Sequence, residues 1–517
     1  MSLPLTLQRY IINECWKDRF IPRQWKYSMS LVCWQWFNHI STRLIVDVPV
    51  TLITGGVRNP NDEDYLIDVT NEDKLSIDIK NSLDHMFNTR FNLLSHSRVI
   101  ELHVFPLKVN DIRTSLFHLD LTEFLRLLSN GEQWVIKIIF VNRPVKMSLF
   151  LRLEMEAMLR KIVGHPNTTI EFSGDCDLNS YIVDQIMAAR KVTRVNFRVV
   201  GSEPEYNEKR LVHSLVGHCH TLRTLPQVDL TEYWIHMTPK LNRFTQLTSM
   251  MISSDYEEII GQLARHCPHF ETLGINYTSS YERKQKGWEC LCKLKISKLK
   301  LFLMSSDLVT QFMQKIDQVS SLSLSAYFDA HPFTLNLGRN LRRLSIPLNL
   351  VKYINKDPEY CGANLTSLKV YGDNMDGDHY DDLSTFLENN ARSQGVSDAG
   401  GPRLNHLSYW YDTKANTEML NFYCRAVFPR LHRAIIRHPT LVTLTTNMNR
   451  PNPSMLLREL ADNQTIKLVT WKAPTANTIK LINYHKLFDY VDMHKTVAKC
   501  YRYLDPDRPR PNNSNFS

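Results

Sequence analysis

The chain lacks the features that would mark a membrane protein or a secreted protein. No apolar run approaches the roughly 18 residues that cross a bilayer, and the strongest, residues 134–141, is short and contains Lys137. Charged side chains between Arg9 and Arg19 interrupt the apolar core that a secretion signal would need. The sequence therefore predicts a protein without a membrane partner, located in the cytoplasm, with the nucleus left open as a second compartment.

Motifs of catalysis and metal binding are missing as well. The sequence has no phosphate-binding glycine loop, dinucleotide glycine fingerprint, G-x-S-x-G elbow, H-E-x-x-H motif or set of kinase motifs. Its ten cysteines are scattered, and Cys290-x-Cys292 has no second ligand pair at zinc-site spacing. The net charge of +9 comes without a long Lys/Arg run, so a nucleic acid is not the expected partner. We expect no enzyme activity, no metal and no cofactor.

One apolar pattern recurs along most of the chain: an apolar residue, two variable residues, an apolar residue, one variable residue and a third apolar residue. Clear copies start at Val99, Val135, Val192, Leu247, Phe270, Ile296, Val319, Leu341, Leu365, Leu404 and Ile466. Weaker copies start at Asn167, Leu222 and Leu441. Helical patterns lie between many copies, including residues 181–189, 208–216 and 256–266. Each repeat is therefore expected to form a strand followed by a returning helix.

The spacing of these copies indicates how the units assemble. From Leu247 to Leu365 they recur every ~20 to 29 residues, the period of leucine-rich repeats. A single unit of this kind cannot bury its apolar face, so units stack side by side with parallel strands. The predicted fold class is α/β: an irregular leucine-rich-repeat solenoid, a parallel curved sheet with outer helices, preceded by a small all-helical module.

Two phrases between the helical and strand patterns support the same family. Residues 218–222, HCHTL, and 266–270, HCPHF, resemble the C-x-x-L phrase of cysteine-containing leucine-rich repeats. This type of repeat is often attached to an F-box, so the resemblance directs attention to the N-terminal helices.

Residues 3–41 carry more large apolar side chains than so short a segment can bury. Four of the nine tryptophans lie here: Trp16, Trp25, Trp34 and Trp36. Two helical patterns are separated by Pro22. A segment of about 40 residues seldom supports its own core, so these rings must pack on the next domain, on a partner, or on both.

This segment resembles an F-box, the adaptor-binding module of cullin-type ubiquitin ligases. The matching residues are Leu3-Pro4, Leu7, Ile11, Ser30-Leu31-Val32-Cys33, Trp36 and Ile40. The resemblance implies a Skp-family adaptor and a cullin complex as partners. The residues expected to form the adaptor surface or its immediate support are Leu3, Pro4, Leu7, Ile11, Leu31, Val32 and Trp36. The alternative is a helical cap that seals the end of the next domain.

Pattern and composition together divide the chain into five segments. We expect an F-box-like helical module at 1–45, a connecting or N-terminal capping segment at 46–98, the leucine-rich-repeat solenoid at 99–475, a C-terminal capping helix at 476–504 and a disordered tail at 505–517.

Strand periodicity also predicts which side chains face the open side of the sheet. The third, fifth and seventh positions of each copy alternate with the buried ones. These positions hold the cations Lys137, Arg194, Arg198, Lys298, Lys300, Arg343, Lys369 and Lys472, against Glu101 and Glu171. The predicted target-binding residues are Lys298, Lys300, Arg343, Lys369, Tyr371 and Trp410. An acidic or phosphorylated protein is the expected target, and the alternative is that these charges only keep an exposed sheet hydrated.

The two resemblances together imply a non-catalytic substrate-recognition subunit of a cullin-type ubiquitin ligase. It would bind the adaptor through the N-terminal helices and a target through the repeats. The alternative is a leucine-rich-repeat interaction scaffold or inhibitor without ubiquitin-ligase association.

Overall fold

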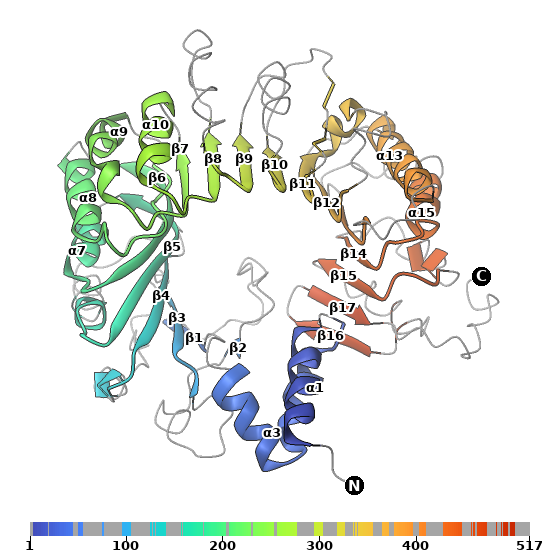
Figure 1. Ribbon diagram of the computed structural model, residues 1–517, viewed down its shortest axis with the longest axis horizontal. Coiled ribbons are helices and arrows are strands. Elements are labelled where there is room, and N and C mark those ends of the chain that lie inside the picture. The colour runs from blue at the N-terminus through green and yellow to red at the C-terminus, as the bar shows by residue number, and fades with distance from the viewer. Residues whose placement is uncertain are drawn as a thin grey trace, which may run out of the picture. The chain divides into compact units, whose positions relative to one another are not determined.

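The computed structural model is mixed α/β, with helices and mostly parallel strands (Figure 1). It describes residues 4–44 except 19, 50–54, 75–76, 96–104, most of 125–140, most of 157–276, 294–302, 318–325, most of 334–354, 364–371, 377–395, 403–409, 428–446 and parts of 456–501. The chain divides into two compact units. Unit 1 comprises Met1–Leu273 and Thr278–Leu294, and unit 2 comprises Gly274–Tyr277 and Lys295–Ser517.

Unit 1 begins with a group of short helices. They are α1 (Leu5–Lys17), α2 (Arg23–Ser28), the 3-10 helix η1 (Met29–Leu31), α3 (Trp34–His39) and the π-helix η2 (Ile40–Leu44). Pro22 precedes α2 in an extended conformation, as expected for a residue with no N–H to donate. The predicted helical character of this segment is confirmed, and we call these residues, 4–44, the N-terminal helices.

A parallel sheet follows, with strand order β2-β1-β3-β4-β5-β6. Its strands are β1 (Val50–Thr54), β2 (Leu75–Ser76), β3 (Val99–Val104), β4 (Trp134–Phe140), β5 (Thr168–Leu178) and β6 (Val192–Ser202). Val99 lies opposite Val135 and Leu102 opposite Ile138, so the first two clear copies pair in register. Ile138 lies opposite Phe172, which places the next copy two residues later than the predicted start at Asn167. Burial is unaffected because a shift of two residues keeps each side chain on the same face.

The rest of unit 1 adds helices to this sheet and extends its edge. The elements are α7 (Ser180–Ala188), α8 (Tyr206–Gly217), α9 (Thr231–Met237), the 3-10 helix η4 (Thr238–Arg243), β7 (Ser249–Ile252) and α10 (Tyr256–His266), and β8 (Thr272–Asn276) crosses the boundary between the units. Thr224 forms parallel bridges to Arg194 of β6 and Ser249 of β7. The helices predicted at 181–189, 208–216 and 256–266 are confirmed within two residues.

Unit 2 contains seven parallel strands whose repeated leucines form one continuous row. The strands are β9 (Lys298–Phe302), β10 (Ser321–Ser325), β11 (Arg343–Pro347), β12 (Ser367–Tyr371), β13 (His406–Tyr409), β14 (Thr443–Thr446) and β15 (Leu468–Lys472). The fourth positions of seven successive copies pair in register: Leu299, Leu322, Leu344, Leu368, Leu407, Leu444 and Val469. All seven are at most 2% exposed, because this row forms the core of the unit.

Helices lie along one side of the later strands of unit 2 (Figure 1). They are the 3-10 helix η6 (Leu348–Tyr353), α13 (Gly377–Gly395) and α15 (Phe428–Ile436). The apolar pattern of the sequence does not indicate α15, in which Pro429 occupies the first turn, where its missing N–H costs nothing. Arg430 of α15 pairs with Asp381 and Glu388 of α13 at 3.4 and 3.2 Å, and so fastens the two helices together.

The expected C-terminal helix at 476–504 is wrong for its last part. Residues 490–501 form two antiparallel strands, β16 (Tyr490–His494) and β17 (Val497–Tyr501), and β17 pairs with β15. Cys500 is fully buried opposite Val469. Pairing with β15 satisfies backbone groups that the last parallel strand would leave open, and this tertiary gain outweighs the local helical pattern.

Both cysteines of the two C-x-x-L-like phrases are buried. Cys219 is 6% exposed and Cys267 is 4% exposed, and the Cys267 thiol donates to the carbonyl of Phe244 at 3.4 Å. Burial raises the pKa of Cys267 to about 11. These thiols therefore serve as small packing groups between neighbouring repeats.

Candidate functional site

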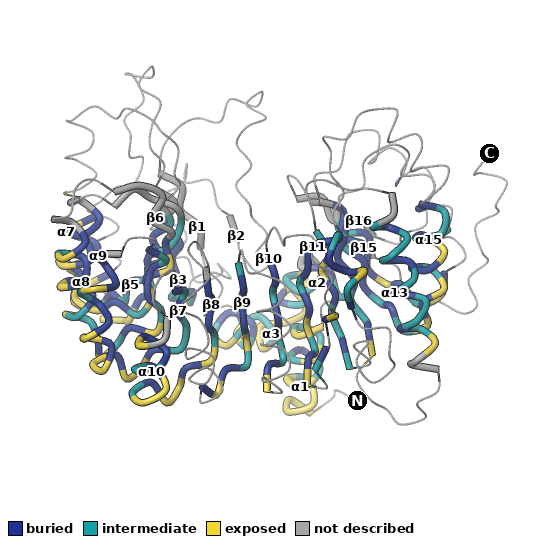
Figure 2. Tube along the Cα trace, turned by 90° about the horizontal axis from the view of Figure 1, so that it is seen from above, coloured by how far each residue is buried: buried dark blue, intermediate teal, exposed yellow. Residues whose placement is uncertain are grey.

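Exposed apolar side chains concentrate on the N-terminal helices. Figure 2 colours much of α1 as exposed. In the described part of the chain nine large apolar side chains are exposed, and seven of them lie between residues 5 and 34. These seven are Leu5, Leu7, Tyr10, Trp25, Leu31, Val32 and Trp34. Ile12 and Ile40 are the large apolar side chains that the N-terminal helices bury most completely. A segment this apolar and this exposed is typical of a surface that binds another protein.

Polar contacts fix how these helices pack together. The Trp36 indole N–H donates to Gln8 Oε1 at 2.8 Å, and His39 Nε2 lies 3.0 Å from Asn13 Oδ1. Both contacts join α1 to α3. Trp36 is therefore held between helices and supports their arrangement.

The predicted adaptor residues divide into a surface group and a supporting group. Pro4, Leu7, Leu31 and Val32 are exposed, with Leu31 82% and Val32 63% exposed. Two are half-buried: Ile11 and Trp36. Leu3 lies outside the described residues.

The open side of the unit 2 strands, which carries their exposed side chains, presents cations separated by serines. One row across four strands reads Lys298, Ser321, Arg343 and Ser367, and the next reads Lys300, Ser323, Ser345 and Lys369. All four cations are exposed, as the alternation of each strand predicts. Within the ranges that the structure describes, no carboxylate pairs with Lys298, Lys300 or Arg343. We call these two rows the basic face of unit 2.

Tyr371 lies at one end of this face and is only half exposed. Its hydroxyl donates to the carbonyl of Leu324 on β10, and Lys369 Nζ lies 5.9 Å from the centre of its ring. Burial raises the pKa of Tyr371 to about 12, so the hydroxyl stays protonated. The structure thus brings five of the six predicted target-binding residues onto one face, while Trp410 lies outside the described residues.

The corresponding row in unit 1 contains both glutamates that the pattern places among the open-facing positions. Its four neighbouring strands carry Glu101, Lys137, Glu171 and Arg194 opposite one another. Arg194 Nε lies 3.5 Å from Glu171 Oε1. Glu101 is 0% exposed, although its position in the pattern predicts an open-facing side chain. Positive and negative charges alternate along this row and compensate each other.

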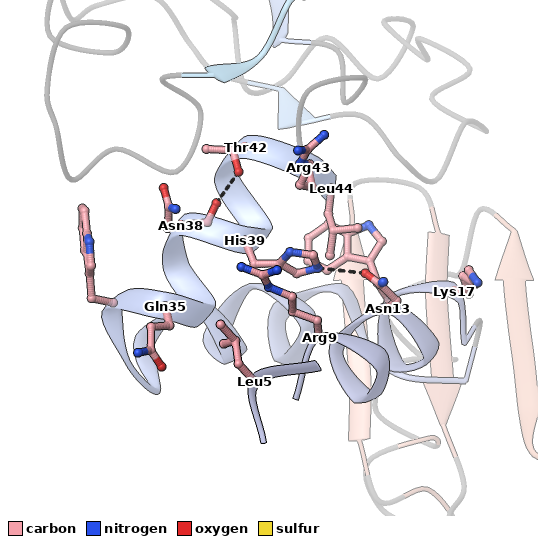
Figure 3. Close-up of a pocket in the computed structure, with 12 residues that line it drawn as sticks. Leu5, Arg9, Asn13, Lys17, Gln35, Asn38, His39, Thr42, Arg43 and Leu44 are labelled. Atoms are coloured by element: carbon pink, nitrogen blue, oxygen red, sulfur yellow. Dashed lines mark hydrogen bonds between the residues drawn. The ribbon is translucent and has the colours of Figure 1, made fainter. Parts of the chain in front are cut away.

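A pocket of about 650 Å³ lies beside α1, α3 and η2 (Figure 3). Its lining residues are Leu5, Arg9, Asn13, Trp16, Lys17, Trp34, Gln35, Asn38, His39, Thr42, Arg43 and Leu44. The sequence does not indicate this pocket, because the pocket depends on the angle at which the helices cross. The one available signal was the spacing of Arg9, Asn13 and Lys17, which places them along one side of α1.

Other classes of site find no support in the described ranges. No three His, Cys, Asp or Glu side chains there are grouped so that they could hold a metal ion. None of the helices described is both long and apolar enough to cross a bilayer.

Comparison with known proteins adds no relative. No protein-family model matches the chain, and no curated protein matches it.

Proposed function

We propose that this chain is a non-catalytic substrate-recognition subunit of a cullin-type ubiquitin ligase. The N-terminal helices bind a Skp-family adaptor, and the repeats hold a target protein. The observation that carries the proposal is the concentration of exposed apolar side chains on the N-terminal helices, three of which, Leu7, Leu31 and Val32, match the F-box pattern.

The energetics of the N-terminal helices favour a bound partner. Covering a side chain the size of Leu or Val contributes about 1.5–3 kcal/mol, and Leu7, Leu31 and Val32 are all exposed. A helical adaptor that covers them would recover this free energy, as in other complexes in which apolar helix faces meet a groove.

The strands and cysteines support a leucine-rich-repeat architecture for the rest of the chain. Seven parallel strands of unit 2 pair with their repeated apolar positions in register. Cys219 and Cys267 are buried at the ends of the helices that precede their strands, as expected for cysteine-containing repeats. We therefore infer an irregular leucine-rich-repeat solenoid.

The basic face of unit 2 suggests the chemistry of the target. Lys298, Lys300 and Arg343 have no ion pair among the described residues, and serines leave space between them. An acidic or phosphorylated segment would supply the missing charge, and Arg343 could hold a phosphate with two parallel hydrogen bonds.

Such a protein carries out no bond-breaking step of its own. Holding a target beside a ubiquitin-charged enzyme raises the effective concentration of the target's lysines and replaces a bimolecular encounter by an intramolecular one. The rate of ubiquitin transfer then depends on how long the target remains bound.

The test is co-purification of the full chain with a Skp-family adaptor. The double variant Leu31→Asp/Val32→Asp should reduce adaptor capture by about tenfold or more, since it places two charges in an apolar interface. Both residues are exposed, so folding should survive. The matched control is Met187→Asp/Ile235→Asp, which changes two residues that are 49% and 57% exposed elsewhere in unit 1.

Equal capture by the wild-type chain and the Leu31/Val32 variant would contradict the proposal. The N-terminal helices would then be a cap, and the chain a leucine-rich-repeat scaffold or inhibitor without ubiquitin-ligase association.

A further inference from the structure

The pocket beside α1, α3 and η2 has a one-sided charge. Its lining includes the cations Arg9, Lys17 and Arg43 and no Asp or Glu. Lys17 is compensated by Glu14, 3.1 Å away. Arg9 and Arg43 form no ion pair with any residue that the structure describes. Arg9 and Arg43 therefore line the pocket without a counter-charge among the described residues.

Neutral hydrogen-bonding groups lie between the two arginines. His39 contacts Asn13 Oδ1 through Nε2, and Figure 3 shows His39 beside Arg9 with Arg43 at the upper end of the pocket. The pKa of His39 is lowered first by burial and then by the charges of Arg9 and Arg43. Both charges thus reach His39, and the space around its ring carries a positive potential that an anion would compensate.

None of the predicted adaptor residues lines this pocket, although the exposed side chains of Leu5 and Trp34 do. Arg9 and Asn13 are one turn apart and share a side of α1. Leu7 precedes Arg9 by two residues, which at about 100° per residue turns it about 200° away. A ligand in the pocket would therefore leave Leu7 free.

We propose that this pocket binds a phosphate monoester. A phosphate monoester carries about −1.5 to −2 charges at pH 7 and offers three acceptor oxygens, which suits two guanidinium forks and the neighbouring amide of Asn13. A carboxylate would bring one charge and two oxygens. Trp16 and Leu5 add apolar surface for the carbon body of the ligand, and a pocket of about 650 Å³ lies within the range that holds small ligands.

The phosphate group could come from a small phosphorylated molecule or from a phosphorylated protein segment. The experiment uses both sources with the full chain: free phosphoserine by isothermal titration, and the fluorescein-labelled peptide Gly-Ala-phosphoserine-Ala-Gly by anisotropy. The same peptide with unmodified serine is the ligand control. We expect saturable binding of the phosphorylated probes and none of the serine peptide.

The variant Arg9→Gln/Arg43→Gln should bind about tenfold more weakly or worse, because it removes charge-assisted hydrogen bonds from the site. Both residues are exposed and the substitution keeps their polarity, so folding should be unaffected. Arg9→Lys/Arg43→Lys should give an intermediate affinity, since it keeps the charge and loses the fork. A peptide that binds at least tenfold tighter than phosphoserine indicates a protein source, and equal affinities indicate a small molecule.

The matched control removes two exposed cations of η4 in unit 1, as Lys240→Gln/Arg243→Gln. This variant should bind the phosphorylated probes like the wild-type chain. The proposal is overturned if no probe saturates, if Arg9→Gln/Arg43→Gln binds unchanged, or if the control variant loses as much affinity. Adaptor capture by Arg9→Gln/Arg43→Gln should match the wild-type level, so this site and the proposed adaptor contact can fail independently.

Discussion

The two units differ in the charges that their strands carry on the open side of the sheet. In unit 1 the row Glu101, Lys137, Glu171 and Arg194 alternates in sign from strand to strand. In unit 2 the corresponding rows hold cations separated by serines, without a carboxylate among the residues that pair across them. The same strand pattern therefore gives a self-compensated surface in one unit and an uncompensated one in the other. Register across strands, which brings particular side chains opposite each other, decides between the two.

The largest effect should come from reversing a charge in the compensated row. Glu101 is buried opposite the half-buried Lys137, so Glu101→Lys would bury one cation beside another and should lower the free energy of unfolding by about 3–5 kcal/mol. Lys298→Glu makes an equal change of charge on the exposed face of unit 2 and should alter stability by about 0.5 kcal/mol or less. Urea unfolding measures both. Similar losses in the two variants would remove the distinction between the rows.

Acid should lower the stability of unit 2 in particular, because unit 2 buries two histidines. Burial lowers the pKa of His432 and of His438 to about 4, from 6.5. The unfolded chain therefore binds more protons between pH 6.5 and 4, and stability falls as the pH drops through this window. At pH 5, each of the two histidines should have lowered the free energy of unfolding by about 2 kcal/mol.

Measured stability between pH 7 and 5 should fall less steeply for His432→Leu than for the wild-type chain. Leucine fits the apolar site, in which His432 stacks on Phe428 at 5.9 Å between ring centres. His269→Leu is the matched control, because it makes the same replacement at an exposed position. Parallel slopes for His432→Leu and the wild-type chain would show that His432 does not titrate in this range.

The smallest effect concerns target capture. Exchanging Lys298, Lys300, Arg343 and Lys369 for Glu should reduce capture of the target by about tenfold or more while adaptor binding and folding persist. Capture by the wild-type chain should also weaken as salt rises, because exposed charges are screened. Lys240→Glu/Arg243→Glu on η4 of unit 1 is the comparison, because both side chains are exposed, and we expect it to leave capture intact. Loss of capture in that variant alone would move the target site to unit 1.

The strands could be predicted from the sequence because their signal is repeated. Each fourth-position residue, such as Leu344 or Leu368, has neighbours of the same type in adjacent repeats, so errors in one copy do not propagate. Exposure of Lys298 and Arg343 follows from the same alternation. The exposed cations of the strands could therefore be predicted, because their exposure depends only on the direction in which each side chain leaves its strand.

The remaining features depend on contacts between distant residues. The partial burial of Tyr371 requires the hydrogen bond to Leu324, which lies 47 residues away. The burial of Glu101 and the pocket between Arg9 and Arg43 likewise depend on how separate elements meet. Strands at 490–501 replaced the expected helix because β15 offered a backbone edge that local periodicity does not reveal. Pairing and crossing geometry, which a linear pattern does not encode, account for these differences.

The antiparallel strands β16 and β17 have a consequence for synthesis of the protein. As the chain emerges from the ribosome, each new parallel strand of unit 2 presents an open edge until the next strand covers it. The last such edge, β15, remains open until residues 497–501 have been made. An uncovered edge of this kind can pair with another nascent chain. A chain interrupted shortly before residue 497 would therefore carry an intact row of leucines and still be prone to aggregate.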